Sequence, residues 1–300
     1  MGSVEDRIRR LKAERNAVIL AHNYTTAAVQ ELADFVGDSL GLAQMAAATD
    51  ADVIVFCGVS FMGETAKILC PGKEVLLPEP EAHCPMASMC TAEQIRQMRA
   101  RRPGHAVVGY VNSTASSKTE MDICCTSSNA VEVVANLDAD KVIFVPDLNL
   151  GAYVASKVGK EVVLWDGFCP IHHAITVRQV RALAERFPDA PVLAHPECRA
   201  DVLAEADFIG STEGILNEAK ASDAVDFIIL TEVGMGHRLE RECPGKRFHF
   251  PEQAVCTAMK MIDPESVLHV LETGENRVVL PDDVMKRAYK PVKRMTENGI

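Results

Sequence analysis

The sequence predicts an α/β protein made of three repeated modules with small parallel sheets, and three observations point to this class. Short apolar runs rich in β-branched residues alternate with segments of helical periodicity along the chain. One order of elements, from a first strand to a cysteine, occurs three times at a spacing of about 85 residues. Hydrophobic residues make up 48% of the sequence, which is enough to bury sheets of this kind.

Each module begins with a strand whose carboxyl end carries polar side chains. These first strands are expected within residues 18–24, 107–113 and 192–197. A turn rich in Ser and Thr follows about 16 residues later in each module, at 37–39, 126–129 and 210–213. Because helix-compatible sequence follows each turn, we expect the turns to cap helices.

Two further strands and a cysteine complete each module. The second strands are expected at 53–57, 142–145 and 227–230, and the third strands at 75–77, 162–164 and 248–250. Each third strand leads to one cysteine, which is Cys84, Cys169 or Cys256. Right-handed crossovers place the carboxyl ends of parallel strands at one edge of a sheet, so three modules that face inward would share one central site.

The spacing of these elements also sets the expected module boundaries. We place the modules at residues 1–86, 87–171 and 172–259. Apolar residues recur at helical spacing before the first strand, and the segment 260–300 is mostly helical. We expect both chain ends, including the C-terminal helices of 260–300, to pack on the first module.

The charge balance excludes several classes of partner. The chain has 31 Lys and Arg residues against 42 Asp and Glu residues, for a net charge of −11. Such a surface repels polyanions, which argues against nucleic acid and acidic lipid, although a local pocket can still bind a small anionic metabolite. No apolar run approaches the roughly 18 residues that span a bilayer, and the N-terminus is charged. We therefore expect a cytoplasmic protein without a membrane partner.

The cysteines Cys84, Cys169 and Cys256 stand at matching positions of the three modules and are the predicted metal ligands. Three converging thiolates can hold an iron–sulfur cluster with one iron left without a protein ligand, and such an iron acts as a Lewis acid. The same trio could instead hold zinc with a water as the fourth ligand. The other cysteines lack this correspondence and are interpreted as structural: Cys57, Cys70, Cys90, Cys124, Cys125, Cys198 and Cys243.

Polar groups at the ends of the first strands are the candidate catalytic residues. They are His22, Asn23, Tyr24, Tyr110, Asn112, His195 and Glu197. Glu197 is a candidate general base or acid, the histidines and tyrosines are candidate proton donors, and Asn112 is a candidate orienting amide. His172 and His173 follow Cys169 closely and are candidates to lie beside the metal.

The Ser/Thr turns are candidate anion sites, because hydroxyl groups and free amides at helix N-termini bind phosphate or carboxylate. Their side chains are Ser39, Ser127, Ser211 and Thr212. Three such turns in register predict a substrate with more than one acidic group. Neither GxxxxGK[ST] nor GxGxxG occurs, so nucleotide binding has no positive support.

With these motifs the chain closely resembles the quinolinate synthase family of iron–sulfur enzymes. The resemblance runs almost from end to end, through Ala21-His22-Asn23-Tyr24, Gly37-Asp38-Ser39-Leu40, Cys84-Pro85-Met86-Ala87, Tyr110-Val111-Asn112-Ser113, Cys169-Pro170-Ile171-His172, His195-Pro196-Glu197-Cys198 and Gly210-Ser211-Thr212. It implies three αβα modules about a pseudo-threefold axis, with a central [4Fe-4S] cluster held by three cysteines.

The resemblance implies a transferase-type synthase that condenses iminoaspartate (iminosuccinate) with dihydroxyacetone phosphate to quinolinate, releasing phosphate and two waters, for NAD biosynthesis. An aspartate oxidase or dehydrogenase would supply the imine. The cluster ligands would be Cys84, Cys169 and Cys256, and Glu197, Tyr24, His22, Tyr110 and His195 would be catalytic. The substrate pocket would comprise His22, Ser39, Tyr110, Val111, Asn112, Ser127, His195, Pro196, Glu197, Ser211 and Thr212.

One departure and one alternative remain at this point. Some family members carry CxxCxxC near the last cluster cysteine, whereas Cys256 stands alone here, as in the short form of the family. This puts thiol–disulfide regulation of that segment in doubt. The alternative function is another [4Fe-4S] hydro-lyase that acts on a hydroxy diacid through the same open iron.

Overall fold

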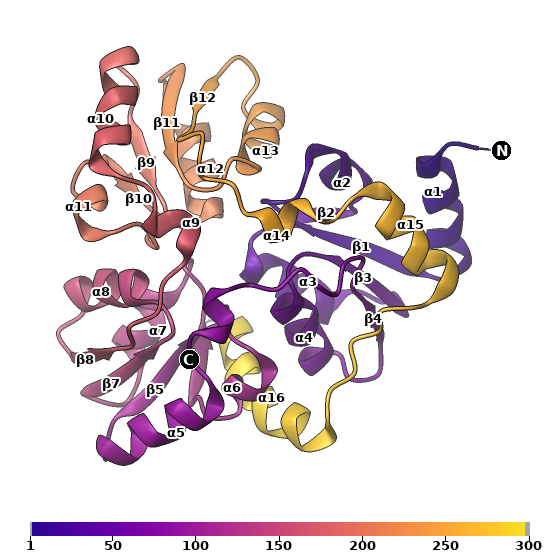
Figure 1. Cartoon of the computed structure of the whole chain (residues 1–300), viewed down its shortest axis with the longest axis horizontal. Coiled ribbons are helices and arrows are strands. Elements are labelled where there is room, and N and C mark those ends of the chain that lie inside the picture. The colour runs from indigo at the N-terminus through magenta and orange to yellow at the C-terminus, as the bar shows by residue number, and fades with distance from the viewer. Residues whose placement is uncertain (1, 298–300) are drawn as a thin grey trace.

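Three four-stranded parallel sheets form the computed structural model, which describes residues 2–297. The strand orders are β2-β1-β3-β4, β6-β5-β7-β8 and β10-β9-β11-β12, so the same topology occurs three times. Helices lie on the faces of each sheet, and the three sheets surround a common centre (Figure 1). The predicted α/β class with three repeated αβα modules is therefore confirmed.

The first sheet contains β1 (Ala17–His22), β2 (Phe35–Gly37), β3 (Val53–Cys57) and β4 (Glu74–Leu76). Its helices are α1 (Val4–Glu14), α2 (Ala27–Leu32), α3 (Ser39–Ala48) and α4 (Ser60–Leu69), followed by the 3-10 turn η1 (Met86–Ser88). The second sheet contains β5 (Ala106–Tyr110), β6 (Ile123–Cys125), β7 (Lys141–Val145) and β8 (Glu161–Leu164). Its helices are α5 (Ala92–Arg101), α6 (Ala115–Lys118), α7 (Ala130–Asn136) and α8 (Leu148–Lys157).

The third sheet contains β9 (Val192–Ala194), β10 (Phe208–Ile209), β11 (Asp226–Leu230) and β12 (Arg247–His249). Its helices are α9 (Pro170–His173), α10 (Val177–Arg186), α11 (Ala200–Leu203), α12 (Thr212–Ala221), α13 (Met235–Glu242) and α14 (Thr257–Lys260). Two C-terminal helices follow, α15 (Pro264–Thr273) and α16 (Asp282–Thr296).

Each sheet has one edge strand that the sequence pattern did not predict. These strands are β2, β6 and β10, and each directly precedes one of the Ser/Thr turns. They are two or three residues long. Strands this short carry no periodic signal, and the equally short β4, β9 and β12 were predicted only from their place in the repeat.

The turns cap their helices in three different ways. Asp38, not Ser39, is the N-cap of α3, and its carboxylate accepts from the N–H of Gly41 at 2.8 Å. Asn129 occupies the cap position of α7, two residues after Ser127. Ser211 caps α12 as expected, and its hydroxyl accepts from the N–H of Gly214 at 3.2 Å.

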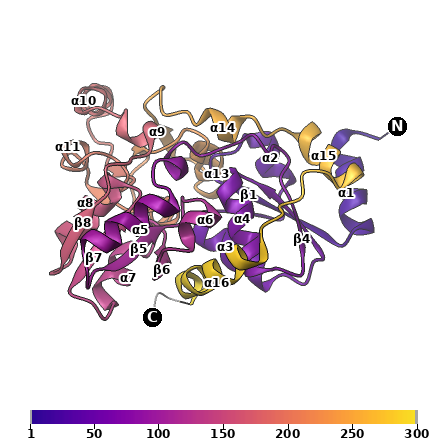
Figure 2. The ribbon, with the colours of Figure 1, turned by 60° about the horizontal axis from the view of Figure 1, so that its bottom comes forward.

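The C-terminal helices join separate parts of the fold. Helix α15 packs on α1 and β3 of the first sheet, whereas α16 packs on α3 and α4 and also on α6 and β6 of the second sheet (Figure 2). Arg294 of α16 donates to the carbonyl of Asp122 at 2.9 Å. The second half of 260–300 thus lies against two sheets, and the module boundaries themselves stay a prediction.

The apolar core consists of several separate clusters of buried residues. One cluster of buried residues runs through the first and second sheets and includes Val292 and Met295 of α16. The third sheet has separate clusters on its two faces. In the part of the chain that the structure describes, no helix is long and apolar enough to cross a membrane.

Candidate active site

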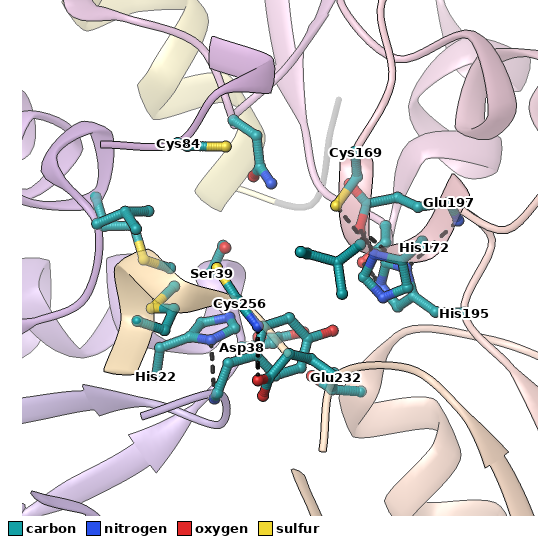
Figure 3. Close-up of a pocket in the computed structure, with 18 of the residues that line it drawn as sticks. His22, Asp38, Ser39, Cys84, Cys169, His172, His195, Glu197, Glu232 and Cys256 are labelled. Atoms are coloured by element: carbon teal, nitrogen blue, oxygen red, sulfur yellow. Dashed lines mark hydrogen bonds and ion pairs between the residues drawn. The ribbon is translucent and has the colours of Figure 1, made fainter. Parts of the chain in front are cut away.

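One cavity lies where the carboxyl ends of the central strands β1, β5 and β9 meet. His22 ends β1, Tyr110 ends β5 and His195 follows β9, and all three side chains line the cavity. Cys84, Cys169 and Cys256 line it as well and come from three different segments (Figure 3). The repeated topology therefore brings the repeated polar residues together.

The three predicted ligands differ from the other cysteines in their exposure. All ten cysteines are free, but Cys84, Cys169 and Cys256 are partly exposed while the other seven are buried. Burial around the cavity raises the pKa of Cys84 to about 12 and also raises the pKa of Cys169 and Cys256. A bound cation is needed to hold such thiols as thiolates, so metal loading at this site releases protons.

The thiol spacing bears on which metal group fits. Among the described residues, only Cys169, His172 and Glu197 place three ligand atoms within 4.8 Å of one another. The three cysteine sulfurs do not form such a group, and one zinc ion would need them about that close. A larger group with several metal atoms fits three converging but more widely spaced thiols.

Glu197 is the central acid of the cavity. Its Oε2 lies 3.0 Å from Nδ1 of His172 and 3.2 Å from Nδ1 of His195, and the residue is 3% exposed. Burial alone would raise the pKa of Glu197, but the two imidazoles outweigh it and hold this pKa below its usual range. Its Oε1 is buried and has no hydrogen-bond partner, so it is free to accept a proton or a ligand group.

Two hydrogen bonds and one ion-pair contact connect Tyr24 to Glu197. The hydroxyl groups of Tyr24 and Thr231 are 2.7 Å apart, and Thr231 Oγ1 is 2.9 Å from Nε2 of His172. Nδ1 of His172 then lies 3.0 Å from Glu197 Oε2 and 3.2 Å from the sulfur of Cys169. Burial, and next the charge of Glu197, raise the pKa of the Tyr24 phenol well above its usual range, so this group donates rather than ionises.

His22 and His195 occupy matching places in the first and third modules. Nδ1 of His22 accepts from the N–H of Tyr24 at 3.2 Å, and Nδ1 of His195 lies 3.4 Å from the N–H of Glu197. Burial, and then the neighbouring His195, lower the pKa of His22 to about 3. His22 is therefore neutral near pH 7 and presents its Nε2 hydrogen to the cavity.

Most of the predicted site residues line this cavity. They are His22, Tyr24, Ser39, Cys84, Tyr110, Asn112, Ser127, Cys169, His195, Glu197, Thr212 and Cys256. Val111, Pro196 and Ser211 do not. Val111 belongs to the core between the first two sheets, Pro196 lies between two lining residues, and Ser211 uses its hydroxyl as a helix cap. The roles of all these residues stay a prediction.

The structure also adds residues to the site. His172 lines the cavity as suggested by its place after Cys169, whereas His173 is not among the lining residues and contacts Asn149. Asp38 and Glu232 line the cavity without having been predicted. The repeat held a signal for Glu232, because it follows the end of β11 by two residues just as Asp147 follows β7.

Three sheets that turn their strand ends to one cavity, with thiols, imidazoles and a carboxylate on its walls, define an α/β enzyme with a cysteine-lined site. The family model described as Quinolinate synthetase A protein matches residues 6–297. The chain belongs to this family, the quinolinate synthases, as its motifs predicted.

Three relatives named quinolinate synthase illustrate the similarity. The one from Methanosarcina barkeri is 53% identical, over 97% of this chain and 96% of the relative. The one from Methanoregula boonei is 51% identical, over 97% of each. The one from Aquifex aeolicus is 48% identical, over 98% of this chain and 94% of the relative.

Proposed function

We propose that this protein condenses iminoaspartate with dihydroxyacetone phosphate to quinolinate, with release of phosphate and two waters. The observation that carries the proposal is the cavity itself. Of ten cysteines, the three at equivalent repeat positions are the ones partly exposed, and they line the same cavity as Glu197 with its unpartnered oxygen. The name of the relatives, quinolinate synthase, agrees with the proposed product.

The donor set fits a [4Fe-4S] cluster held by Cys84, Cys169 and Cys256. Three cysteines for four irons leave one iron without a protein ligand. Such an iron supplies Lewis-acid chemistry toward a carboxylate, hydroxyl or imine group. Glu197 Oε1 and Asn112 Oδ1 are buried acceptors without partners and line the cavity, as expected for side chains that await a bound molecule.

The anionic groups of the substrates are assigned to the Ser/Thr turns. Ser39 lies in the first turn of α3, Thr212 begins α12, and Ser127 lies just before α7. All three line the cavity. Hydroxyl donors beside the positive end of a helix dipole bind carboxylate and phosphate without a basic side chain, which suits an acidic protein.

Proton transfer is assigned to Glu197 and Tyr24. Glu197 is ionised and takes a proton from the carbon or nitrogen that reacts, while the neutral phenol of Tyr24 gives one to a leaving hydroxyl group. The proton then returns from Glu197 to Tyr24 through His172 and Thr231. His172 Nδ1 lies 3.0 Å from Glu197 Oε2, and hydrogen bonds of 2.9 and 2.7 Å connect His172 Nε2, Thr231 Oγ1 and the Tyr24 hydroxyl.

The test is iron and acid-labile sulfide content after anaerobic purification, followed by an assay of quinolinate formation from both substrates. About four of each per chain, and quinolinate only when dihydroxyacetone phosphate is present, are expected. Activity on a hydroxy diacid alone would favour the alternative [4Fe-4S] hydro-lyase. Zinc, or no metal in folded protein, would refute the cofactor assignment.

The proposal extends to the surroundings of the enzyme. Imines hydrolyse in water, so an aspartate oxidase or dehydrogenase must supply iminoaspartate as it is used. The product serves NAD biosynthesis, and the oxygen-sensitive cluster suits a cytoplasmic setting. Adding such a supplier to the assay is expected to sustain quinolinate formation from aspartate.

A further inference from the structure

A backbone contact that occurs in all three modules places the cavity cysteines. In each module, the third residue after the second strand (β3, β7 or β11) donates its N–H to the carbonyl of the residue two positions before the cysteine. These bonds are Ser60 to Ala82 at 2.8 Å, Leu148 to Gly167 at 2.7 Å and Val233 to Ala254 at 2.9 Å. The side chain just before each donor therefore occupies the same place relative to its cysteine.

In two modules this place is held by a buried carboxylate. Asp147 Oδ2 accepts from the N–H of Cys169 at 3.2 Å, and Glu232 Oε1 accepts from the N–H of Cys256 at 3.0 Å. Both acids are 0% exposed. In the first module the same place holds Val59, which has no group that can accept from Cys84.

The second oxygen of each acid is also engaged by backbone. Asp147 Oδ1 accepts from the N–H of Leu150 at 2.8 Å, and Glu232 Oε2 accepts from the N–H of Gly234 at 2.7 Å. Lys260 pairs with Glu232 at 2.9 Å. Because both oxygens accept from N–H groups, an amide in place of either acid would turn an NH₂ group toward a donor and lose one bond.

We propose that Asp147 and Glu232 are positioning residues that hold two of the three cluster ligands, Cys169 and Cys256, whereas Cys84 has no such residue. The inference rests on the proposed function, because it assumes that the cysteines bind a cluster. Each acid fixes the backbone of its cysteine, which limits where the sulfur can lie. Packing alone does not require a buried acid at the same place in two repeats, since burial of a carboxylate is costly.

The test is the rate at which a ferrous chelator, bathophenanthroline disulfonate, removes iron from anaerobically purified protein without substrate. Asp147→Val and Glu232→Val copy the residue of the first module, and each is expected to release iron about tenfold faster or more. The swaps Asp147→Glu and Glu232→Asp are expected to restore slow release, because the repeat itself uses either acid at this place.

A control separates cysteine positioning from ordinary helix capping. Asp147 also caps α8, so Asp263→Val removes a comparable aspartate cap at the start of α15 with the same substitution. This variant is expected to release iron at the wild-type rate. Equal rates for Asp147→Val, Glu232→Val and Asp263→Val would overturn the inference.

A second readout responds to the charge beside the cluster. Glu232→Gln leaves the ammonium of Lys260 near Cys256 without its carboxylate partner, so the midpoint potential of the bound cluster is expected to become more positive. An unchanged potential together with unchanged iron release would contradict the proposal even if the variant is less stable. Wild-type protein without iron would instead refute the cofactor assignment, whereas iron-loaded wild type with unaffected variants refutes only this inference.

Discussion

Glu197→Gln is the change that tests the proposed chemistry most directly. The amide has nearly the same shape as the carboxylate, and its oxygen can still accept from His172 and His195, which lie 3.0 and 3.2 Å from Glu197 Oε2. What is lost is the ability to take up a proton at Oε1, which has no partner in the cavity. We therefore expect a loss of turnover without a loss of fold.

The size of the effect follows from the role assigned to the residue. A positioned acid–base group contributes about 100-fold to 10,000-fold in rate, which equals roughly 3–5 kcal/mol of activation free energy. Because substrate anions are assigned to the Ser/Thr turns, kcat should fall by this factor while KM changes little. The assay is quinolinate formation under anaerobic conditions, with iron content measured on the same sample.

The matched control is Glu205→Gln in the same module. Glu205 forms a surface ion pair with Arg181 at 2.8 Å, so its loss should leave both rate and iron content at the wild-type level. A Glu197→Gln variant that holds full iron and turns over within a few-fold of wild type would refute the assignment of Glu197 to proton transfer.

Three further predictions concern metal loading, pH and stability. Alanine at any one of the three cavity cysteines should abolish most bound iron. Cys90→Ala should retain the iron, because Cys90 is buried and does not line the cavity. Equal iron retention by all four variants would contradict the ligand assignment. In iron-free protein, the unfolded chain protonates His22 below about pH 6.5 but the folded chain does so only near pH 3. Acidification from about pH 6.5 to 5 should thus lower the free energy of unfolding by about 1–2 kcal/mol through this residue, and His22→Gln should remove that part of the decline in urea melts. The fully buried ammonium of Lys118 donates to the Ser113 carbonyl at 2.7 Å. Lys118→Met should therefore lower the free energy of unfolding by about 1–3 kcal/mol. An unchanged urea midpoint would show that this bond does not stabilise the fold.

The repeated plan of the molecule was readable from the sequence. Apolar strands of five or six residues, such as β1 and β11, leave a pattern that survives without tertiary information. The recurrence of one cysteine after each third strand pointed to Cys84, Cys169 and Cys256, and all three line the cavity. Residues at equivalent positions of a repeat can be detected in the sequence because they recur at the spacing of the repeat.

Other features depended on contacts between distant segments. The edge strands β2, β6 and β10 have only two or three residues and show no period. Helix α16 packs on α4 of the first module and on α6 and β6 of the second. An amphipathic helix reveals that one face is buried but not which surface covers it. Its partners were therefore decided only when the chain folded.

The sequence by itself determined the class of fold, the family and the side chains that gather at the strand ends, because these follow from local pattern and regular spacing. Only the tertiary structure decided that Thr231 connects Tyr24 to His172, and that Asp147 and Glu232 hold the cysteine backbones. A hydrogen bond forms over about 3 Å, and residues far apart in the chain reach that distance only through the packing of whole sheets.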